Sequence, residues 1–382
     1  MNKALKITLR ILSYILVAAL AVGVTFWACG GNTKMTQLKA LIQQVYVEDV
    51  DWQAAEDAAC AALVDSLPDG WSFYISASEY ESYLADMKND YVGVGITIQV
   101  REDGKGQDIL QVEPGSSAQE MGVLPGDMLV QVDGVSTAGM DVSQVAQMIR
   151  GEEGGQVQVT VLRDDKTVEI TLTRSRFQRQ VATGKMLEGN VGYITIVNFH
   201  ENSAQQTIAV IEDLVAQGAQ ALVFDVRNNG GGYKDEMVEL LDYLLPEGPL
   251  FRSVNYLGRE EVDNSDAGCL ELPMAVLINK RTYSAAEFFA AALEEYDWAV
   301  TVGEATIGKG HFQVAYPLGD GSAVSLSVGK YCTPNGVSLA DVGGLVPGVP
   351  VEVDQETEAM IYSGLLAAEE DPQLQAALEA LK

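Results

Sequence analysis

Three polar segments of this sequence carry side chains that could do chemistry, and each follows an apolar stretch. They are residues 225–232 (Asp-Val-Arg-Asn-Asn-Gly-Gly-Gly), 282–287 (Thr-Tyr-Ser-Ala-Ala-Glu) and 306–313 (Thr-Ile-Gly-Lys-Gly-His-Phe-Gln). A glycine-rich turn presents backbone N–H groups that can stabilise an oxyanion or cradle a phosphate. Ser284 at the start of a helix would face the positive end of the helix dipole, which favours a developing anion. The same serine also fits a helix cap with Glu287 three residues later, and both roles can coexist.

Lys309 is the candidate base. A lone lysine is usually a solvated surface charge, but Lys309 lies between Gly308 and Gly310 in a mostly apolar region. A lysine without bulky neighbours can lie against a packed site and lose solvation. Burial can lower a lysine pKa by about 3–5 units from its ordinary value of about 10.4. The neutral amine could then accept the proton of a serine hydroxyl.

Other kinds of site stay open at this point. A Ser-His-Asp scheme would need His200 or His311, the two histidines of the chain, as its base, but no GxSxG turn accompanies them. A phosphate site in the loop at 228–232 lacks the spacing of either glycine-rich phosphate motif. A catalytically silent peptide-binding scaffold would be expected to lack Ser284 or Lys309, and both are present. We expect no cofactor and no metal, since the four cysteines show no CxxC spacing.

An α/β pattern positions these segments. Strands are predicted at 192–196, 221–226, 274–278 and 299–302, and helices at 204–217 and 284–295. The strands at 221–226 and 274–278 are continuously apolar, which is typical of parallel strands buried on both faces. Chemistry in such a sheet lies at the carboxyl ends of its strands, where the three polar segments fall.

The region before it, from about residue 91 to 172, is a β-rich domain that resembles a PDZ domain. The resemblance rests on the order of its elements and on Tyr91-Val-Gly-Val-Gly-Ile96, Gly126-Asp127 and Ile149-Arg-Gly151. It implies a peptide C-terminus added as a strand beside the helix at 142–150. The carboxylate would be held by backbone N–H groups of Gly93, Val94, Gly95 and Ile96. The alternative is an ordinary small β-domain with turn glycines.

The N-terminus predicts a membrane anchor. Lys3, Lys6 and Arg10 precede an uncharged 19-residue stretch at 11–29, long enough to cross a bilayer. Basic residues beside a membrane span stay on the cytoplasmic side, so the folded part of the chain that follows the span is expected on the extracytoplasmic side. A cleaved signal peptide or a lipidated form at Cys29 is the alternative. The region 34–90 is predicted to be helical, and its helices at 34–67 could form a homodimer.

Composition excludes some partners. The chain has 382 residues, with 24 Lys and Arg against 54 Asp and Glu, so its formal net charge is −30. Such a charge argues against nucleic acid and against docking of the folded part on an anionic membrane. In an exported protein a Cys269–Cys332 disulfide could form.

In their order along the chain, the three segments resemble the C-terminal processing peptidases, also called tail-specific proteases. The motifs are Arg227-Asn-Asn-Gly-Gly-Gly232, Tyr283-Ser-Ala-Ala-Glu287, Gly308-Lys-Gly310 with Gln313, Tyr331-Cys-Thr-Pro-Asn-Gly336 and Gly344-Leu-Val-Pro347. Two positions depart from the family: Gly230 replaces a proline and Gly348 an aspartate. Neither departure removes a group that the chemistry needs.

The resemblance implies a Ser-Lys mechanism. Ser284 would be the nucleophile, Lys309 the general base and Gln313 the residue that orients the lysine. Backbone N–H groups of Gly231 or Gly232 and of Ala285 would form the oxyanion hole. Substrates would be proteins with accessible C-terminal tails. An adaptor protein that activates the enzyme is an open alternative among its partners.

We therefore expect a multidomain protein of α/β plus β class. Its parts would be a membrane anchor at 1–33, a helical segment at 34–90, a PDZ domain at 91–175 and a crotonase-like α/β serine protease domain at 176–382. The predicted function is that of a membrane-anchored, extracytoplasmic serine endopeptidase.

Overall fold

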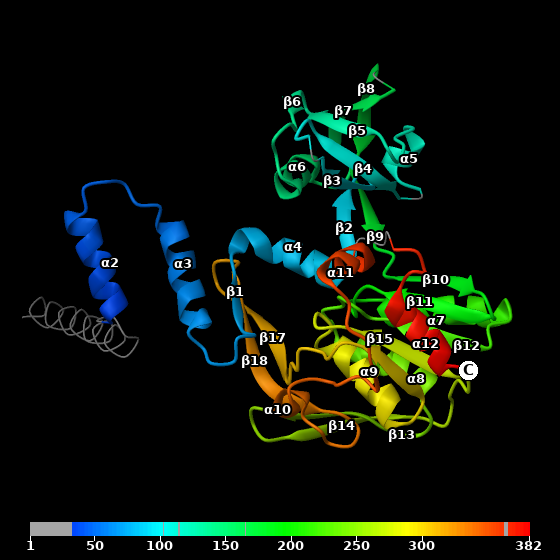
Figure 1. Ribbon diagram of the computed structural model, residues 1–382. Coiled ribbons are helices and arrows are strands. Elements are labelled where there is room, and N and C mark those ends of the chain that lie inside the picture. Colours follow the sequence, from blue (N-terminus) through cyan, green and yellow to red (C-terminus); the bar gives the residue numbers. More distant parts are fainter. Residues whose placement is uncertain (1–32, 102, 114, 165, 363–365) are drawn as a thin grey trace, which may run out of the picture. The chain divides into compact units, whose positions relative to one another are not determined.

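The computed structural model describes residues 33–101, 103–113, 115–164, 166–362 and 366–382. The chain separates into two compact units, residues 1–63 and 64–382, whose elements are labelled in Figure 1. No helix of the described residues is long and apolar enough to cross a membrane. The span expected at 11–29 lies outside the described residues.

The described part of the first unit is helical, as the sequence predicts. It contains α2 (Lys34–Val45), capped by the hydroxyl of Thr33, and most of α3 (Trp52–Asp65). Lys39 of α2 forms an ion pair with Glu56, and its ammonium lies 5.2 Å from the Trp52 ring. No residue of α2 is buried within the chain. The homodimer expected from this region stays a prediction.

The second unit is built around a six-stranded sheet. Its order is β10 (Ala182–Leu187), β11 (Val191–Ile196), β12 (Ala221–Asp225), β15 (Met274–Ile278), β16 (Ala299–Gly303) and β19 (Val349–Pro350). β10 is antiparallel to β11, and the other neighbours are parallel. Every residue of β12 and β15 is buried, as their continuous apolar sequences predict.

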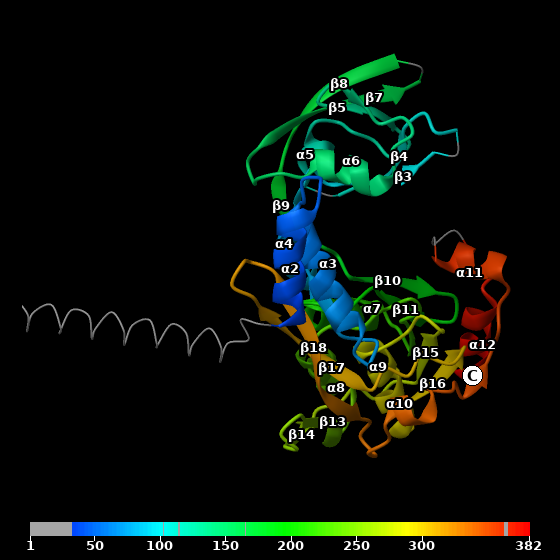
Figure 2. The ribbon, with the colours of Figure 1, turned by 90° about the vertical axis from the view of Figure 1, so that its left-hand side faces the viewer.

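Helices cover both faces of this sheet (Figures 1 and 2). One face packs against α7 (Ser203–Ala216) and α9 (Ala285–Glu295), with α8 (Lys234–Leu244) between these helices. The other face packs against α12 (Pro372–Ala380). Phe289 of α9 is fully buried and meets Phe224 of β12 edge to face, with ring centroids 5.4 Å apart. Burying one such side chain contributes about 1.5–3 kcal/mol, so this core holds α9 firmly against the sheet.

A second sheet joins distant parts of the chain. Its strands are β1 (Phe73–Ile75), β13 (Gly248–Asn255), β14 (Glu260–Ser265), β17 (His311–Pro317) and β18 (Ala323–Cys332), with β18 pairing β1, β13 and β17. The sequence predicts a helical segment at 34–90, and the strand β1 within it was not predicted. It is a strand because its backbone pairs with β18, Phe73 opposite Ser325. The residues after β1 are helical, as predicted for this segment, and form α4 (Ala77–Met87) with Ser76 as its cap.

Three short helices complete the second unit outside the small domain. They are α10 (Leu339–Val342), α11 (Gln355–Tyr362) and α12, already described. Cys60, Cys269 and Cys332 are free thiols, so the disulfide considered for Cys269 and Cys332 is not formed.

Residues 96–173 form a separate small domain with the element order expected of a PDZ domain. Its strands are β3 (Ile96–Val100), β4 (Gln107–Val112), β5 (Met128–Val132), β6 (Val135–Ser136), β7 (Gln156–Arg163) and β8 (Lys166–Thr173), and its helices are α5 (Ser117–Glu120) and α6 (Val142–Ile149). The chain enters and leaves through a two-stranded ribbon of β2 (Asp90–Gly93) and β9 (Ser175–Gln178). The motif Tyr91–Ile96 spans the end of β2 and the start of β3, which are separated at Gly95, whose φ is +81°.

Candidate active site

The loop after β12 and the turn before α9 are joined by hydrogen bonds. The backbone N–H of Asn228 donates to Asn279 Oδ1 at 3.0 Å, and Asn279 Nδ2 donates to Asn228 Oδ1 at 3.0 Å. The Thr282 hydroxyl donates to the carbonyl of Val226 at 2.9 Å. Two of the three polar segments are thus held side by side, as the rule for parallel strands predicts.

Ser284 lies at the turn between β15 and α9 in an unusual backbone conformation. Its φ is +59° and its ψ is −133°. A non-glycine residue in such a region costs free energy and persists only where the surrounding structure enforces it. A tight strand-to-helix turn of this kind can present a nucleophilic hydroxyl.

The side chain of Tyr331 faces this serine. Tyr331 is 3% exposed, and its hydroxyl has no protein hydrogen-bond partner in the described residues at ordinary geometry. Burial raises the pKa of Tyr331, while the nearby Ser284 hydroxyl acts in the opposite direction. The phenol is therefore a neutral polar group directed at the predicted nucleophile.

The buried carboxylate of Glu287 connects the serine turn to the lysine loop. Its Oε1 accepts the backbone N–H groups of Ser284 at 3.1 Å and Lys309 at 2.7 Å. Its Oε2 accepts the Gly308 N–H at 3.0 Å and the Thr306 hydroxyl at 2.7 Å. Burial raises the pKa of Glu287, and these four hydrogen bonds oppose that rise. One side chain of α9 therefore fixes the backbone of both predicted catalytic residues.

Lys309 lies in the loop between β16 and β17, with its ammonium against two aromatic rings. Nζ is 5.0 Å from the Trp71 ring and 5.9 Å from the Tyr283 ring. Burial lowers the pKa of Lys309 to about 8, although the charges of Glu287 and Asp69 act to raise it. The loss of solvation that the flanking glycines predict is therefore present.

Gly308 is required by the packing of this loop. Its φ is +80°, and a Cβ there would lie 2.7 Å from the backbone nitrogen of Gly344. A side chain at this position would push the lysine loop away from the segment at 343–344.

Gln313 does not bond to Lys309 in this structure. Its amide Nε2 donates to the carbonyl of His311 and to the hydroxyl of Ser327, both at 3.0 Å. Its Oε1 accepts no hydrogen bond within the described residues. The orienting role expected for Gln313 stays a prediction.

The predicted oxyanion hole lies beside Ser284. A Cβ on Gly231 would lie 2.7 Å from Ser284 Cβ and 2.8 Å from the Ala285 nitrogen, and its φ is +85°. The Gly231 N–H already donates to Asn229 Oδ1 at 2.8 Å. The N–H groups of Gly232 and Ala285 have no acceptor in the described part of the chain. Of the two glycine candidates, Gly232 has the available donor.

Arg227, beside this loop, is not free to bind a phosphate. Its guanidinium donates to Asp225, to Asp371 and to Gln373 Oε1, and all four residues are buried. This network ties the end of β12 to the start of α12. The phosphate alternative therefore lacks its basic group.

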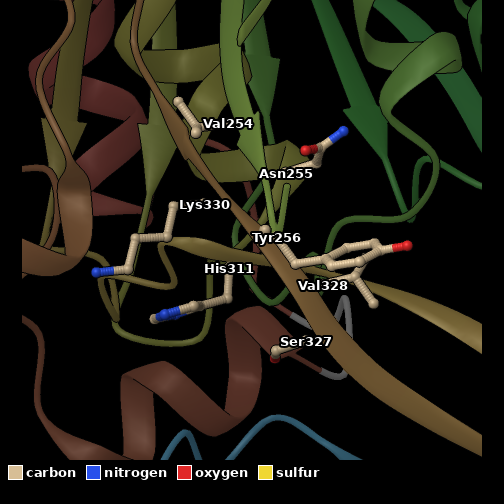
Figure 3. Close-up of a pocket in the computed structure, with 8 residues that line it drawn as sticks. Val254, Asn255, Tyr256, His311, Ser327, Val328 and Lys330 are labelled. Atoms are coloured by element: carbon tan, nitrogen blue, oxygen red, sulfur yellow. The ribbon is translucent and has the colours of Figure 1, made fainter. Parts of the chain in front are cut away.

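No hydrogen bond joins either histidine to Ser284 within the described residues. His200 Nδ1 lies 2.8 Å from the carbonyl oxygen of Asp86. His311 lines a pocket of about 330 Å³ on the second sheet, together with residues of β13 and β18 (Figure 3). Figure 3 shows His311 and Lys330 extending in the same direction from paired strands. Ser327, which accepts a hydrogen bond from Gln313, also lines this pocket.

In the small domain, β3 is an edge strand and α6 packs against it. An edge strand beside a helix can accept an added peptide strand. Val94 is buried, and a Cβ on Gly95 would lie 2.2 Å from Ser116 Cβ, so the backbone at 94–95 is tightly packed. Gly93 ends β2 and Ile96 begins β3, so the four predicted carboxylate-binding positions form one continuous bend.

Sequence reasoning missed Trp71 and Tyr331 as site residues and assigned Glu287 only a capping role. Tyr331 is the first residue of the motif Tyr331-Cys-Thr-Pro-Asn-Gly336, and this motif was the signal that could have identified it as a site residue. Nothing local in the sequence links Trp71 to Lys309, because their contact depends on the pairing of β1 with β18.

Two family models match this chain. One, described as peptidase family S41, matches residues 190–351, and the other, a PDZ domain, matches residues 109–163. The first range contains the glycine loop, Ser284 and Lys309, and the second contains α6.

Several curated proteins are similar over most of the chain. The carboxy-terminal processing protease CtpA of Bacillus subtilis is 30% identical over 334 residues, which are 85% of this chain and 71% of that protein. A carboxyl-terminal-processing protease of Picosynechococcus is 30% identical over 329 residues, 85% of this chain and 78% of that protein. The structure of a putative S41 protease from Bacteroides fragilis has the same fold, with a TM-score of 0.54 and 18% identity, covering 88% of this chain and 92% of that one.

Proposed function

Because the chain belongs to the carboxy-terminal processing proteases of peptidase family S41, we propose that it is an endopeptidase using Ser284 as nucleophile and Lys309 as general base. The observation that carries the proposal is the environment of Lys309. Its ammonium lies against two rings, makes no hydrogen bond within the described residues and has a pKa of about 8. At pH 7 roughly one such lysine in ten is neutral, against about one in three thousand at a pKa of 10.5.

The reaction proceeds in two halves. Neutral Lys309 takes the hydroxyl proton of Ser284 as Oγ attacks the scissile carbonyl. The same proton passes to the leaving amine, and an acyl-serine remains. Lys309 then takes a proton from water, the hydroxide attacks the ester, and the proton returns to Ser284 as the new carboxyl product leaves.

The negative oxygen of the tetrahedral intermediate is stabilised by the N–H groups of Gly232 and Ala285. Both are unengaged in the described residues, and Ala285 begins α9, where the helix dipole adds to the effect. Gln313 supports the base through Oε1, which remains able to accept a hydrogen bond from Lys309 once the side chain turns toward it.

Labelling of the nucleophile tests this proposal. A fluorophosphonate reagent loses fluoride to an activated serine, and mass spectrometry of the digest locates the adduct. We expect the adduct on Ser284, its absence in Ser284→Ala and at least a hundredfold slower labelling in Lys309→Arg. Ser338→Ala, which changes the cap of α10, is the matched control. An adduct on another serine, or full labelling of Lys309→Arg, would contradict the proposal.

Recognition of protein C-terminal tails is proposed for the small domain. The support is its edge strand β3, the neighbouring helix α6 and the PDZ family match. Removing residues 96–173 while keeping the β2–β9 ribbon should abolish the preference for a free apolar tail. Basal cleavage of an unstructured chain should remain. Equal tail preference before and after the deletion would contradict this role.

We also propose that residues 11–29 anchor the chain in a membrane, with the folded part that follows on the extracytoplasmic side. Its support is the basic residues before this apolar stretch. The full chain should stay in membranes after an alkaline carbonate wash, and added protease should digest its body in intact spheroplasts. Recovery of the full-length chain in the soluble fraction would contradict the anchor.

A further inference from the structure

The turn at residues 68–72 is held in one conformation by Asp69. Asp69 Oδ1 accepts the backbone N–H groups of Trp71 at 2.7 Å and Ser72 at 2.8 Å. Its Oδ2 accepts the Ser72 hydroxyl at 2.8 Å. Burial acts to raise the pKa of Asp69, but these hydrogen bonds outweigh it and hold the value at about 2. At neutral pH the Asp69 side chain is therefore a carboxylate that can accept all three of these hydrogen bonds.

The same turn is attached to the strands that carry the active site. The backbone N–H of Ser327 on β18 donates to Ser72 Oγ at 3.0 Å, directly before β1 pairs with β18. The hydroxyl of Ser327 accepts the amide of Gln313 at 3.0 Å. A continuous chain of hydrogen bonds therefore runs from Asp69 through Ser72 and Ser327 to Gln313.

This attachment brings the Trp71 indole over the predicted base. The ring centroid lies 5.0 Å from Lys309 Nζ and 5.8 Å from the Tyr283 ring, with 31° between the ring planes. Nζ also lies 5.9 Å from the Tyr283 ring. The two rings come from segments on either side of the small domain in the sequence, and both contact the same ammonium.

We propose that Trp71 is a positioning residue of the active site, whose indole holds Lys309 Nζ beside Tyr283 and keeps water away from it. The segment at 68–72 is then a fourth part of the site, added to the three polar segments of the main domain. The inference rests on the proposed function, in which Lys309 is the general base.

The indole acts on Lys309 in two opposing ways. Its π face attracts the ammonium form, while its bulk excludes water and favours the neutral amine. Burial is the largest influence on the pKa of Lys309, so exclusion of water dominates. The charged groups acting on Lys309 are Glu287 of α9 and Asp69 of the turn, and both favour the ammonium. Without the indole their effect remains and the burial is reduced, so the pKa should rise.

The test compares three variants at Trp71 in the full chain. We expect Trp71→Ala to move the acid limb of the pH profile of kcat/KM upward by about one pH unit, a roughly tenfold loss at pH 7. Trp71→Phe and Trp71→Leu keep an apolar wall and should leave the limb at or below its wild-type position. Phe73→Ala, an exposed aromatic on adjacent β1, is the control and should leave the limb unchanged.

A second readout does not depend on activity. The ¹³Cε signal of Lys309 is titrated by NMR in the Ser284→Ala background, and its absence in Lys309→Arg assigns it. An unchanged titration and an unchanged acid limb in folded Trp71→Ala would overturn the inference. If Trp71→Ala does not fold, the acid limb of Trp71→Leu is the deciding measurement. An upward shift in Trp71→Leu as large as the shift predicted for Trp71→Ala would also overturn the inference. Full cleavage by Lys309→Arg would instead refute the proposed function.

Discussion

Replacing Glu287 by glutamine tests the link between the serine turn and the lysine loop. The carboxylate accepts four hydrogen bonds, two on each oxygen. Glutamine keeps one oxygen and presents an NH₂ group in place of the other, so two donors lose their acceptor. Each buried donor without a partner costs about 1–3 kcal/mol. Glutamine also removes the cost of burying a charge, so we expect a net loss of about 2–3 kcal/mol in the free energy of unfolding.

The same substitution should change the ionisation of Lys309 in a definite direction. The charge of Glu287 acts to raise the pKa of Lys309, which burial lowers to about 8. Without that charge the neutral amine is favoured further, so the pKa falls. The acid limb of kcat/KM should therefore move to lower pH, by about 0.5–1 unit. The maximal rate should fall at the same time, because Ser284 and Lys309 lose the carboxylate that holds both of their backbone N–H groups.

Denaturant unfolding and a pH series of kcat/KM on an unstructured substrate measure the two effects. Glu295→Gln is the matched control, because Glu295 is also on α9 and accepts the Thr333 hydroxyl and the Asn335 N–H away from the site. That variant should lose some stability and keep the wild-type acid limb. An acid limb that stays in place, or moves upward, in Glu287→Gln would refute the reasoning.

Further outcomes are expected elsewhere in the chain. Arg227→Ala leaves the buried carboxylates of Asp225 and Asp371 without their cation, so it should cost about 3–5 kcal/mol of unfolding free energy in denaturant melts. A loss below 1 kcal/mol would contradict that account. Tyr331→Phe removes a hydroxyl directed at Ser284 and should lower kcat about fivefold with little change in melting temperature. Unchanged kcat would exclude a role for that hydroxyl.

Much of the fold could be predicted from local pattern. The continuous apolar runs of β12 and β15 predicted parallel strands, and the polar segments after them do lie at their carboxyl ends. Glycines on both sides of Lys309 predicted a desolvated lysine, and the lysine is half-buried with a lowered pKa. These properties depend on a few neighbouring residues, which is why the sequence alone contains them.

What could not be predicted depends on contacts between distant residues. β1 is a strand because Phe73 pairs opposite Ser325, and no local pattern of apolar residues predicts that pairing. Glu287 has the sequence of a helix cap, yet three of its four hydrogen bonds go to residues 306–309. The N–H of Gly231 has the position of an oxyanion donor but is engaged by Asn229, a bond set by the fold of the loop.

The central claim is that Lys309 is the general base of a serine peptidase. Arginine at this position keeps the charge and can stack on aromatic rings, but it does not deprotonate in proteins. The decisive measurement is cleavage of an unstructured substrate by Lys309→Arg, beside wild type and Lys330→Arg, a lysine change on β18. The account predicts at least a thousandfold loss of kcat/KM in Lys309→Arg and a rate near wild type in Lys330→Arg. Cleavage by Lys309→Arg within tenfold of wild type would contradict it.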